Sequence, residues 1–332
     1  MLLVRTDANS TIGLGHAMRC AALAEAWIET GGRATFAVRE APAALEARLR
    51  STGAAVVRVE TLADETELAR RIGAQWAAVD GYHLGPAHHD AVAGGGARVL
   101  VVDDDGRSAS PAASMVLNQN AHATAALYDG LRGPELLLGL SFALLRREFR
   151  APSSARPIAA RADRVLVTLG GADPANLTPV VLDGLAQFEG LDLVVLVGAA
   201  NPRREELRAR TGPGLRVEVA VDDVASLMRT ADLAVTAAGS TCWELAACGV
   251  PALAVVVADN QAPVARAVED LGLGVHLGDA PSLRAARVEE AFAALRGDAE
   301  TRAEMARRGR AAVDGRGALR VCEAMRSHGG RR

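Results

Sequence analysis

The sequence predicts an α/β protein made of two doubly wound parallel sheets, each covered by helices. Short apolar runs alternate with helix-like stretches along most of the chain, which is typical of parallel strands joined by covering helices. A segment with prolines and serines at residues 150–158 interrupts the alternation and has the composition of a linker. The alternation then starts again, so we expect one domain over residues 1–150 and a second over residues 151–332. A chain of 332 residues is long enough for two such cores.

Six strands are expected in the first domain. The apolar run at residues 2–8 leads into a glycine-containing loop and a helix-like stretch over residues 17–28. The later strands are expected at residues 34–38, 55–59, 76–80, 99–103 and 115–118, with helices over residues 42–50 and 63–73. Ligands of such sheets bind beyond the carboxyl ends of the strands. Polar residues that follow strands are therefore candidates for a site, namely Asp7, Asp80, Tyr82, residues 103–105 and residues 118–120.

Residues 103–105 are three consecutive aspartates. Carboxylates can bind a metal ion, but the side chains of neighbouring residues point in different directions. We therefore expect a solvated turn at residues 103–105 and no metal site.

The second domain repeats the pattern of the first. Strands are expected at residues 165–169, 193–197, 216–219, 233–236, 252–257 and 274–277, with helices that start near Pro174, Pro202, Asp223, Ser240 and Gln261. Residues 282–326 are rich in arginine and alanine and predict two or three closing helices. Two such domains joined by one linker are expected to face each other across a cleft, where one holds a nucleotide and the other receives the attached group.

The composition excludes several classes of function. The chain is 50% hydrophobic and 23% charged, with a net charge of −3, so we expect no nucleic-acid partner. It has no apolar run long enough to insert into a membrane and no signal-peptide pattern at its start, which predicts a cytoplasmic enzyme or binding protein. The four cysteines form no CxxC pair and are expected to be small apolar core residues. There is no lysine, which excludes Schiff-base chemistry and a P-loop.

The first candidate site is the sequence GLGH at residues 13–16. Gly13 and Gly15 let the backbone pass close to a ligand. His16 is expected at the amino end of a helix, where the helix dipole disfavours imidazolium, so that the neutral ring is available as a base near pH 7. A capping or packing role is the alternative for this histidine. The loop lacks the third glycine of the dinucleotide fingerprint.

The second candidate site is the sequence AAGSTCWE at residues 237–244, which follows an expected strand. Gly239 frees the backbone and Ser240 and Thr241 can cap the next helix. The amide groups at this helix start favour an anion. Glu244 lies one turn into the helix, where it can accept hydrogen bonds from ribose hydroxyls. The alternative is an ordinary N-cap followed by a solvated glutamate. Gly170 and Gly171 offer further backbone amides in the same domain.

The chain resembles the PseG family, the UDP-sugar hydrolases of pseudaminic acid biosynthesis, which is itself similar to MurG-type glycosyltransferases with the GT-B fold. The resemblance covers most of the chain. It is carried by RTDA at residues 5–8, IGLGHAMRC at 12–20, LNQN at 117–120, LLRREF at 144–149, GGAD at 170–173, AGSTCWE at 238–244 and NQ at 260–261.

The resemblance implies a GT-B-like fold and hydrolysis of UDP-2,4-diacetamido-2,4,6-trideoxy-β-L-altropyranose to UDP and the free sugar, with no metal or other cofactor. It implies that His16 is the base, that Tyr82 and Asn260 lie near the sugar, and that Glu244 binds the ribose. The other residues expected to bind substrate are Arg5, Asp7, Gly13, Gly15, Asn118, Gly170, Gly171, Asp173, Gly239, Ser240, Thr241 and Gln261.

The chain departs from the family at Leu140 and Phe142, where proline and tyrosine are expected, and at Thr6, where alanine is expected. These departures bear on which sugar is bound more than on the class of protein. The competing interpretations are a GT-B glycosyltransferase, which passes the sugar to an acceptor hydroxyl, and a nucleotide-sugar-binding protein without activity.

Overall fold

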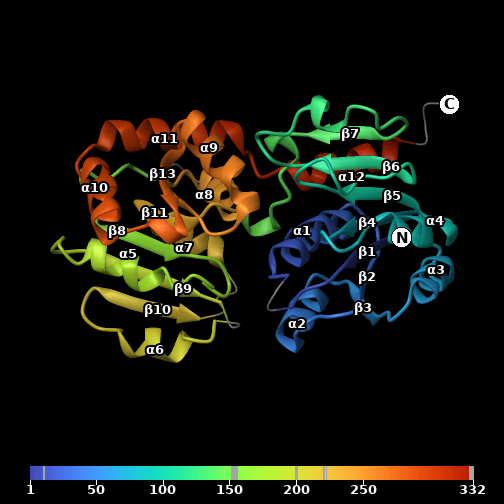
Figure 1. The fold of residues 1–332 in the computed structure, drawn as a ribbon, viewed down its shortest axis with the longest axis horizontal. Coiled ribbons are helices and arrows are strands. Elements are labelled where there is room, and N and C mark those ends of the chain that lie inside the picture. Colours follow the sequence, from blue (N-terminus) through green and yellow to red (C-terminus); the bar gives the residue numbers. More distant parts are fainter. Residues whose placement is uncertain (10–11, 151–155, 199–200, 220, 222, 329–332) are drawn as a thin grey trace. The chain divides into compact units, whose positions relative to one another are not determined.

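The computed structural model describes residues 1–9, 12–150, 156–198, 201–219, 221 and 223–328. The chain divides into two compact units, residues Met1–Arg150 with Gly315–Arg332, and residues Ala151–Asp314. Each unit contains one parallel sheet covered by helices (Figure 1). The predicted fold class, two doubly wound parallel-sheet domains, is therefore confirmed. No helix in the described part of the chain is long and apolar enough to cross a membrane.

The first unit is built on a seven-stranded sheet with the order β3-β2-β1-β4-β5-β6-β7. Its strands are β1 (Leu2–Thr6), β2 (Ala34–Val38), β3 (Ala55–Arg58), β4 (Trp76–Asp80), β5 (Arg98–Val102), β6 (Ala113–Asn118) and β7 (Glu135–Leu138). Its helices are α1 (Gly15–Glu29), α2 (Ala43–Ser51), α3 (Leu62–Arg71), α4 (Pro86–Gly94) and α12 (Gly317–Ser327), with short 3-10 turns at Ala125–Tyr128, Leu140–Phe142 and Arg147–Phe149. The order changes direction beside β1 and β4, which is where an open α/β sheet binds its ligand.

The second unit is built on a six-stranded sheet with the order β10-β9-β8-β11-β12-β13. Its strands are β8 (Arg164–Thr168), β9 (Asp192–Val197), β10 (Leu215–Val219), β11 (Leu233–Ala237), β12 (Ala252–Val256) and β13 (Gly274–Asp279). Its helices are α5 (Thr178–Leu185), α6 (Arg204–Ala209), α7 (Val224–Thr230), α8 (Thr241–Cys248), α9 (Ala262–Asp270), α10 (Ala285–Arg296) and α11 (Ala299–Ala312), with 3-10 turns at Asp259–Gln261 and Ala280–Ser282. Here the order changes direction beside β8 and β11.

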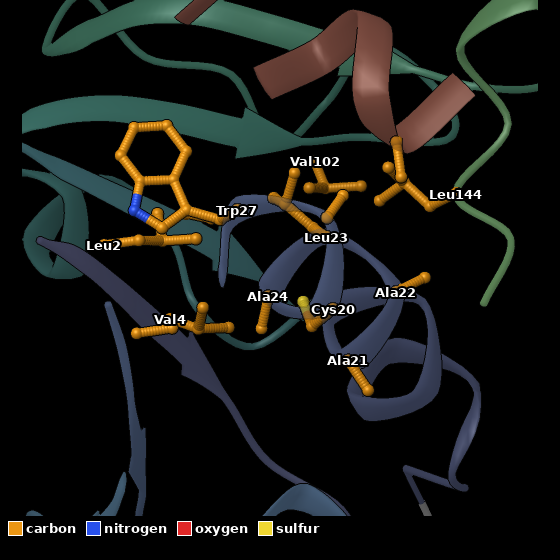
Figure 2. Packing of buried hydrophobic residues seen from close by; sticks show 14 of the residues in the cluster. Leu2, Val4, Cys20, Ala21, Ala22, Leu23, Ala24, Trp27, Val102 and Leu144 are labelled. Carbon is orange, nitrogen blue, oxygen red and sulfur yellow. The ribbon is translucent and has the colours of Figure 1, made fainter. Parts of the chain in front are cut away.

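Helix α1 is rich in small side chains and is buried all round at residues 20–24, with the sequence CAALA, which span more than one turn and are fully or almost fully buried. Leu2 and Val4 of β1 and Val102 of β5 belong to the same buried cluster (Figure 2). Trp27 lies near the carboxyl end of the same helix and is 4% exposed. This packing fixes the amino end of α1 at the carboxyl edge of β1, where the first candidate site lies.

The closing helix α12 belongs to the first unit, whereas the sequence predicts one second domain over residues 151–332. Its apolar residues Ala318, Val321, Cys322 and Met325 lie in the same core cluster as α1. Gly317 starts the helix where a Cβ atom would meet the backbone of residues 142 and 143 at 2.3 to 2.5 Å. Only glycine allows this close approach, so the start of α12 packs directly on the backbone that follows Leu140 in the turn Leu140–Phe142.

Two local expectations were wrong. Residues 135–138 were not expected to form a strand, but they pair in parallel with β6 as the edge strand β7. The helix expected to open at Pro174 starts at Thr178. Asp173 and Asn176 adopt positive φ angles of 42° and 51°, which is a turn geometry that a helix cannot contain.

Candidate functional site

The turn between β1 and α1 presents His16 at the carboxyl edge of the first sheet. Gly13 has a φ of +78°, a conformation that most side chains disfavour, and a Cβ atom on Gly13 or Gly15 would meet nothing within 4 Å. The N-cap residue Leu14 makes no side-chain cap. The space beside Gly13 and Gly15 is thus open, and α1 starts at a residue without a side-chain cap.

His16 is hydrogen-bonded to a buried carboxylate. Its Nδ1 lies 2.7 Å from Oδ1 of Asp80, which is the last residue of β4 and is fully buried. Burial raises the pKa of this carboxyl, but the charge of Arg19 and the contact with His16 outweigh burial and hold the pKa well below its usual range. Asp80 is therefore ionised and can only accept. The Nδ1 atom of His16 must carry the proton, which leaves the lone pair on Nε2.

Arg19 joins Asp80 to a second carboxylate. Its Nε and Nη2 donate to Oδ2 and Oδ1 of Asp80 at 2.6 and 2.7 Å. Its Nη1 donates to Oδ1 of Asp104 at 2.8 Å. Burial lowers the pKa of Arg19, but Asp104 and Asp80 more than reverse this, and its pKa lies well above the usual value. The guanidinium is thus a fixed cation between two anions.

Tyr82 lies against His16 and is tied to the same network. The two rings meet edge to face, with centroids 4.9 Å apart and planes at 86°. The Tyr82 hydroxyl donates to Oδ2 of Asp104 at 3.0 Å, although the residue is 52% exposed. An exposed aromatic ring held in place beside a histidine offers an apolar face on which a sugar ring can pack.

Asn118 supports this network from behind and is fully buried. Its Oδ1 accepts from the backbone N–H and from Nδ2 of Asn120, and its Nδ2 donates to the Tyr128 hydroxyl at 3.1 Å. Asn120 in turn donates to Asp104 at 2.7 Å. Asn118 was expected to bind substrate, but the structure gives it a supporting position.

Arg5 and Asp7 are also buried, at 2% and 3% exposure. Arg5 donates to Glu65 at 2.6 Å and pairs with Asp7 at 2.8 Å. Asp7 accepts from the backbone N–H groups of Arg39 and Glu40. Their side chains are occupied within the first unit, so any effect on substrate comes through the loops that they hold.

Residues 103–105 differ from expectation. Asp103 is 1% exposed and Asp104 is paired with Arg19, so residues 103–105 are not a solvated turn. Burial raises the pKa of Asp103. His89, on α4, is fully buried and contacts Ser110 at 2.8 Å.

In the second unit, the turn between β8 and α5 contains Gly170, Gly171 and Asp173. The two glycines are exposed. Asp173 is 3% exposed, and its carboxylate accepts from the backbone N–H groups of Leu177 and Thr178 at 2.9 and 3.0 Å. Asp173 therefore caps α5. A carboxylate already occupies the amino end of this helix, which leaves an anionic ligand no such place there.

The amino end of α8 differs from that of α5 in its cap. Ser240 is its N-cap residue and makes no side-chain cap, while Gly239, Ser240 and Thr241 are all partly exposed. Gln261 accepts from the backbone N–H of Val257 at 3.0 Å, and its Nε2 would lie 3.8 Å from a Cβ atom on Gly239. Gln261 and Gly239 are therefore neighbours.

The other two residues assigned to this surface also come from adjoining segments. Glu244 is partly exposed in the first turn of α8, and Asn260 is exposed in the 3-10 turn after β12. Strands β11 and β12 are paired in parallel, so their carboxyl ends lie side by side. The sequence therefore predicted a set of residues that the second sheet brings to one edge.

The described residues contain no cluster of three or more histidine, cysteine, aspartate or glutamate side chains suited to an ion. All four cysteines are free and buried, as expected. A hollow of about 270 Å³ involves Met1, Trp27, Arg33, Gln75 and Arg326. It lies at the amino ends of β1, β2 and β4, at the opposite edge of the sheet from His16.

Asp80 and residues 103–105 were candidates only as polar residues that follow strands, with no role assigned to them, and Arg19 was not a candidate. A signal for Arg19 was present, because His16 and Arg19 are three residues apart in a helix and so share one face. The sequence does not say which carboxylate that face meets.

Comparison with known proteins supports the fold and the character of the second unit. Residues 164–316 match the glycosyltransferase family 28 C-terminal domain. The spore coat polysaccharide biosynthesis protein SpsG of Bacillus subtilis (strain 168) is 28% identical over 195 residues, which is 57% of this chain and 56% of SpsG. The chain thus matches little more than half the length of this curated relative.

Two solved structures are similar over almost the whole chain. MurG of Acinetobacter baumannii has a TM-score of 0.65 at 16% identity and covers 98% of this chain and 99% of its own. The complex of S. aureus MnaA with UDP has a TM-score of 0.70 at 12% identity and covers 99% and 96%. The chain therefore has the GT-B fold of two Rossmann-like domains, and its second domain matches the C-terminal domain of glycosyltransferase family 28.

Proposed function

We propose that the protein hydrolyses a UDP-linked diacetamido-trideoxy sugar at the anomeric carbon, without a metal ion, and releases UDP and the free sugar for pseudaminic acid biosynthesis. The observation that carries the proposal is the hydrogen bond between His16 and the ionised Asp80, which leaves Nε2 of the imidazole as a base. The resemblance to the PseG family supplies the identity of the sugar.

The reaction needs two functions, and each unit contains residues suited to one of them. In the first unit, Nε2 of His16 takes a proton from water while the water oxygen bonds to the anomeric carbon. The bond between that carbon and the diphosphate oxygen breaks, and UDP leaves with the electron pair. Attack from the face opposite UDP inverts the anomeric centre. General-base assistance of this kind contributes roughly 10²–10⁴-fold.

In the second unit, the amide groups at the start of α8 suit the diphosphate, since the positive end of a helix dipole stabilises an anion. Glu244 binds the ribose hydroxyls. Ser240, Thr241 and the neighbouring Gln261 contribute polar contacts around the same helix start. The match of residues 164–316 to a glycosyltransferase C-terminal domain supports a nucleotide-binding role for this unit.

A glycosyltransferase is the second candidate, and the same family match favours it. His16 deprotonates an acceptor hydroxyl in that case instead of water. The chemistry at the anomeric carbon is otherwise unchanged, so the two candidates differ only in the nucleophile.

Incubation with UDP-sugars in ¹⁸O-labelled water, without an acceptor, separates these functions. Hydrolysis predicts UDP release together with ¹⁸O at the anomeric carbon of the free sugar, and NMR of the fresh product shows the inverted anomer. UDP release that requires an added acceptor supports transfer and contradicts hydrolysis. Binding without any turnover supports a binding protein.

A further inference from the structure

Arg19 has a position that the base role of His16 does not by itself require. Its Nη2 lies 3.2 Å from Nδ1 of His16, and the same Nη2 donates to Oδ1 of Asp80. Because Nδ1 already carries a proton directed at Asp80, it cannot accept a second hydrogen bond from Arg19. The guanidinium is therefore a cation directly beside the imidazole. Both groups contact the same oxygen, Oδ1 of Asp80, which orients the imidazole.

We propose that Arg19 is a positioning residue that sets the protonation of His16. Asp80 alone would stabilise imidazolium and so block the base. Arg19 opposes this by occupying both oxygens of Asp80 and by placing a positive charge next to the ring. The inference rests on the proposed role of His16 as the base.

Asp104 adjusts the strength of this effect. It accepts from Nη1 of Arg19 at 2.8 Å and from the Tyr82 hydroxyl at 3.0 Å. Its negative charge partly offsets that of Arg19, and its second contact holds the ring that packs on His16. In the described part of the first unit, the charged or titratable groups that face the imidazole are thus Arg19 on α1, Asp80 on β4 and Tyr82 after β4, with Asp104 behind them.

The proposal predicts opposite shifts for two substitutions. In R19Q the two carboxylates lose their cation, so His16 becomes protonated at higher pH, by about one pH unit or more. In D80N the amide still accepts from Nδ1, but the negative charge is gone, so His16 titrates at lower pH. If Arg19 and Asp80 only held the structure together, R19Q and D80N would not move the His16 midpoint in opposite directions.

The test is an NMR titration of the histidine ring protons in the full chain, with His16 assigned from the spectrum of H16N. This measurement needs no substrate, so it succeeds or fails independently of the reaction catalysed. R150Q is the matched control, because the Arg150 side chain is 8% exposed, against 9% for Arg19, and pairs with Glu29 outside the site. Its His16 titration is expected to match that of the wild type.

D104N keeps the proposal testable if R19Q does not fold. Loss of the offsetting carboxylate strengthens the influence of Arg19, so His16 is expected to titrate at lower pH than in the wild type. An unchanged midpoint for His16 in folded R19Q, or in D104N, would overturn the proposal. Where turnover is measurable, the acidic limb of the rate profile should move with the NMR midpoint in each variant.

Discussion

The carboxyl edges of the two sheets carry different kinds of groups. At the first edge, charged side chains are buried and paired with one another, as in the network of His16, Asp80, Arg19 and Asp104. At the second edge, Gly239, Ser240 and Thr241 lie at a helix start whose N-cap residue makes no side-chain cap. Buried ion pairs fix the position and protonation of a base, whereas exposed amides can accept an anion and release it. The difference agrees with the proposed function, in which the first edge transfers the proton and the second binds the nucleotide.

The same contrast appears within the second unit. Helices α5 and α8 both start after a strand of the same sheet, but Asp173 caps α5 with its carboxylate and Ser240 makes no side-chain cap on α8. A carboxylate of the preceding turn holds the start of α5, whereas the N-cap residue of α8 makes no side-chain cap. We therefore place the proposed anion site at the start of α8 and not at the start of α5.

The largest expected effect is on turnover at the first edge. His16→Asn removes the base but changes no residue of the second unit, so turnover should fall roughly 10²–10⁴-fold while UDP affinity, measured by calorimetry, stays the same. His328→Asn is the control, since His328 follows the last residue of α12 and contacts Glu135. Normal turnover in His16→Asn would contradict the proposal that the first edge supplies the base.

The next effect is on the stability of the first unit. Asp7→Asn breaks a buried charge pair with Arg5, which costs roughly 3 kcal/mol. Hydrogen exchange of peptides from β1 and β2 measures this cost, and peptides from the second unit serve as the internal control. Protection of β1 and β2 equal to the wild type would show that the buried pair is not stabilising.

The pH dependence of that stability has a definite sign. Burial raises the pKa of Asp7, but its hydrogen bonds from Arg5 and His83 outweigh burial and hold the pKa well below the usual value. Stability from Asp7 is therefore complete above the unfolded-state pKa of about 3.9 and is lost as pH falls toward the folded-state pKa. Asp7→Asn should be less sensitive to acid than the wild type over this range.

A smaller effect is expected on the stability of the two helices α5 and α8. Asp173→Ala removes a cap and should destabilise α5 by about 1–2 kcal/mol, measured by hydrogen exchange of its amides. Ser240→Ala should leave the protection of α8 nearly unchanged, because no side-chain cap is lost. Equal losses of protection in the two variants would contradict the contrast between the helix starts.

The smallest expected effect is on ribose recognition. Glu244→Ala should weaken UDP binding roughly tenfold, the magnitude of one or two hydrogen bonds to a charged group. The substitution should make little difference to the binding of 2′,3′-dideoxy-UDP, which lacks the hydroxyls. An equal loss for both ligands would show that Glu244 acts on the helix and not on the ribose.

The sequence by itself determined the class of fold and most of the strands. The alternation of apolar runs and helices is a local property, so β1 to β6 and the six strands of the second sheet could be predicted to within a few residues. The glycine loop before His16 and the sequence before Glu244 were recognisable for the same reason, since the turn after a strand depends on neighbouring residues.

Tertiary structure decided which side chains meet. Asp80 is 64 residues from His16 and Asp104 is 85 residues from Arg19, and only the order of β1, β4 and β5 in the sheet brings them together. The same holds for α12, which returns to the first unit because its apolar face fits the small side chains of α1. Contacts between distant segments depend on packing and on the pairing of buried charges, which no local pattern records.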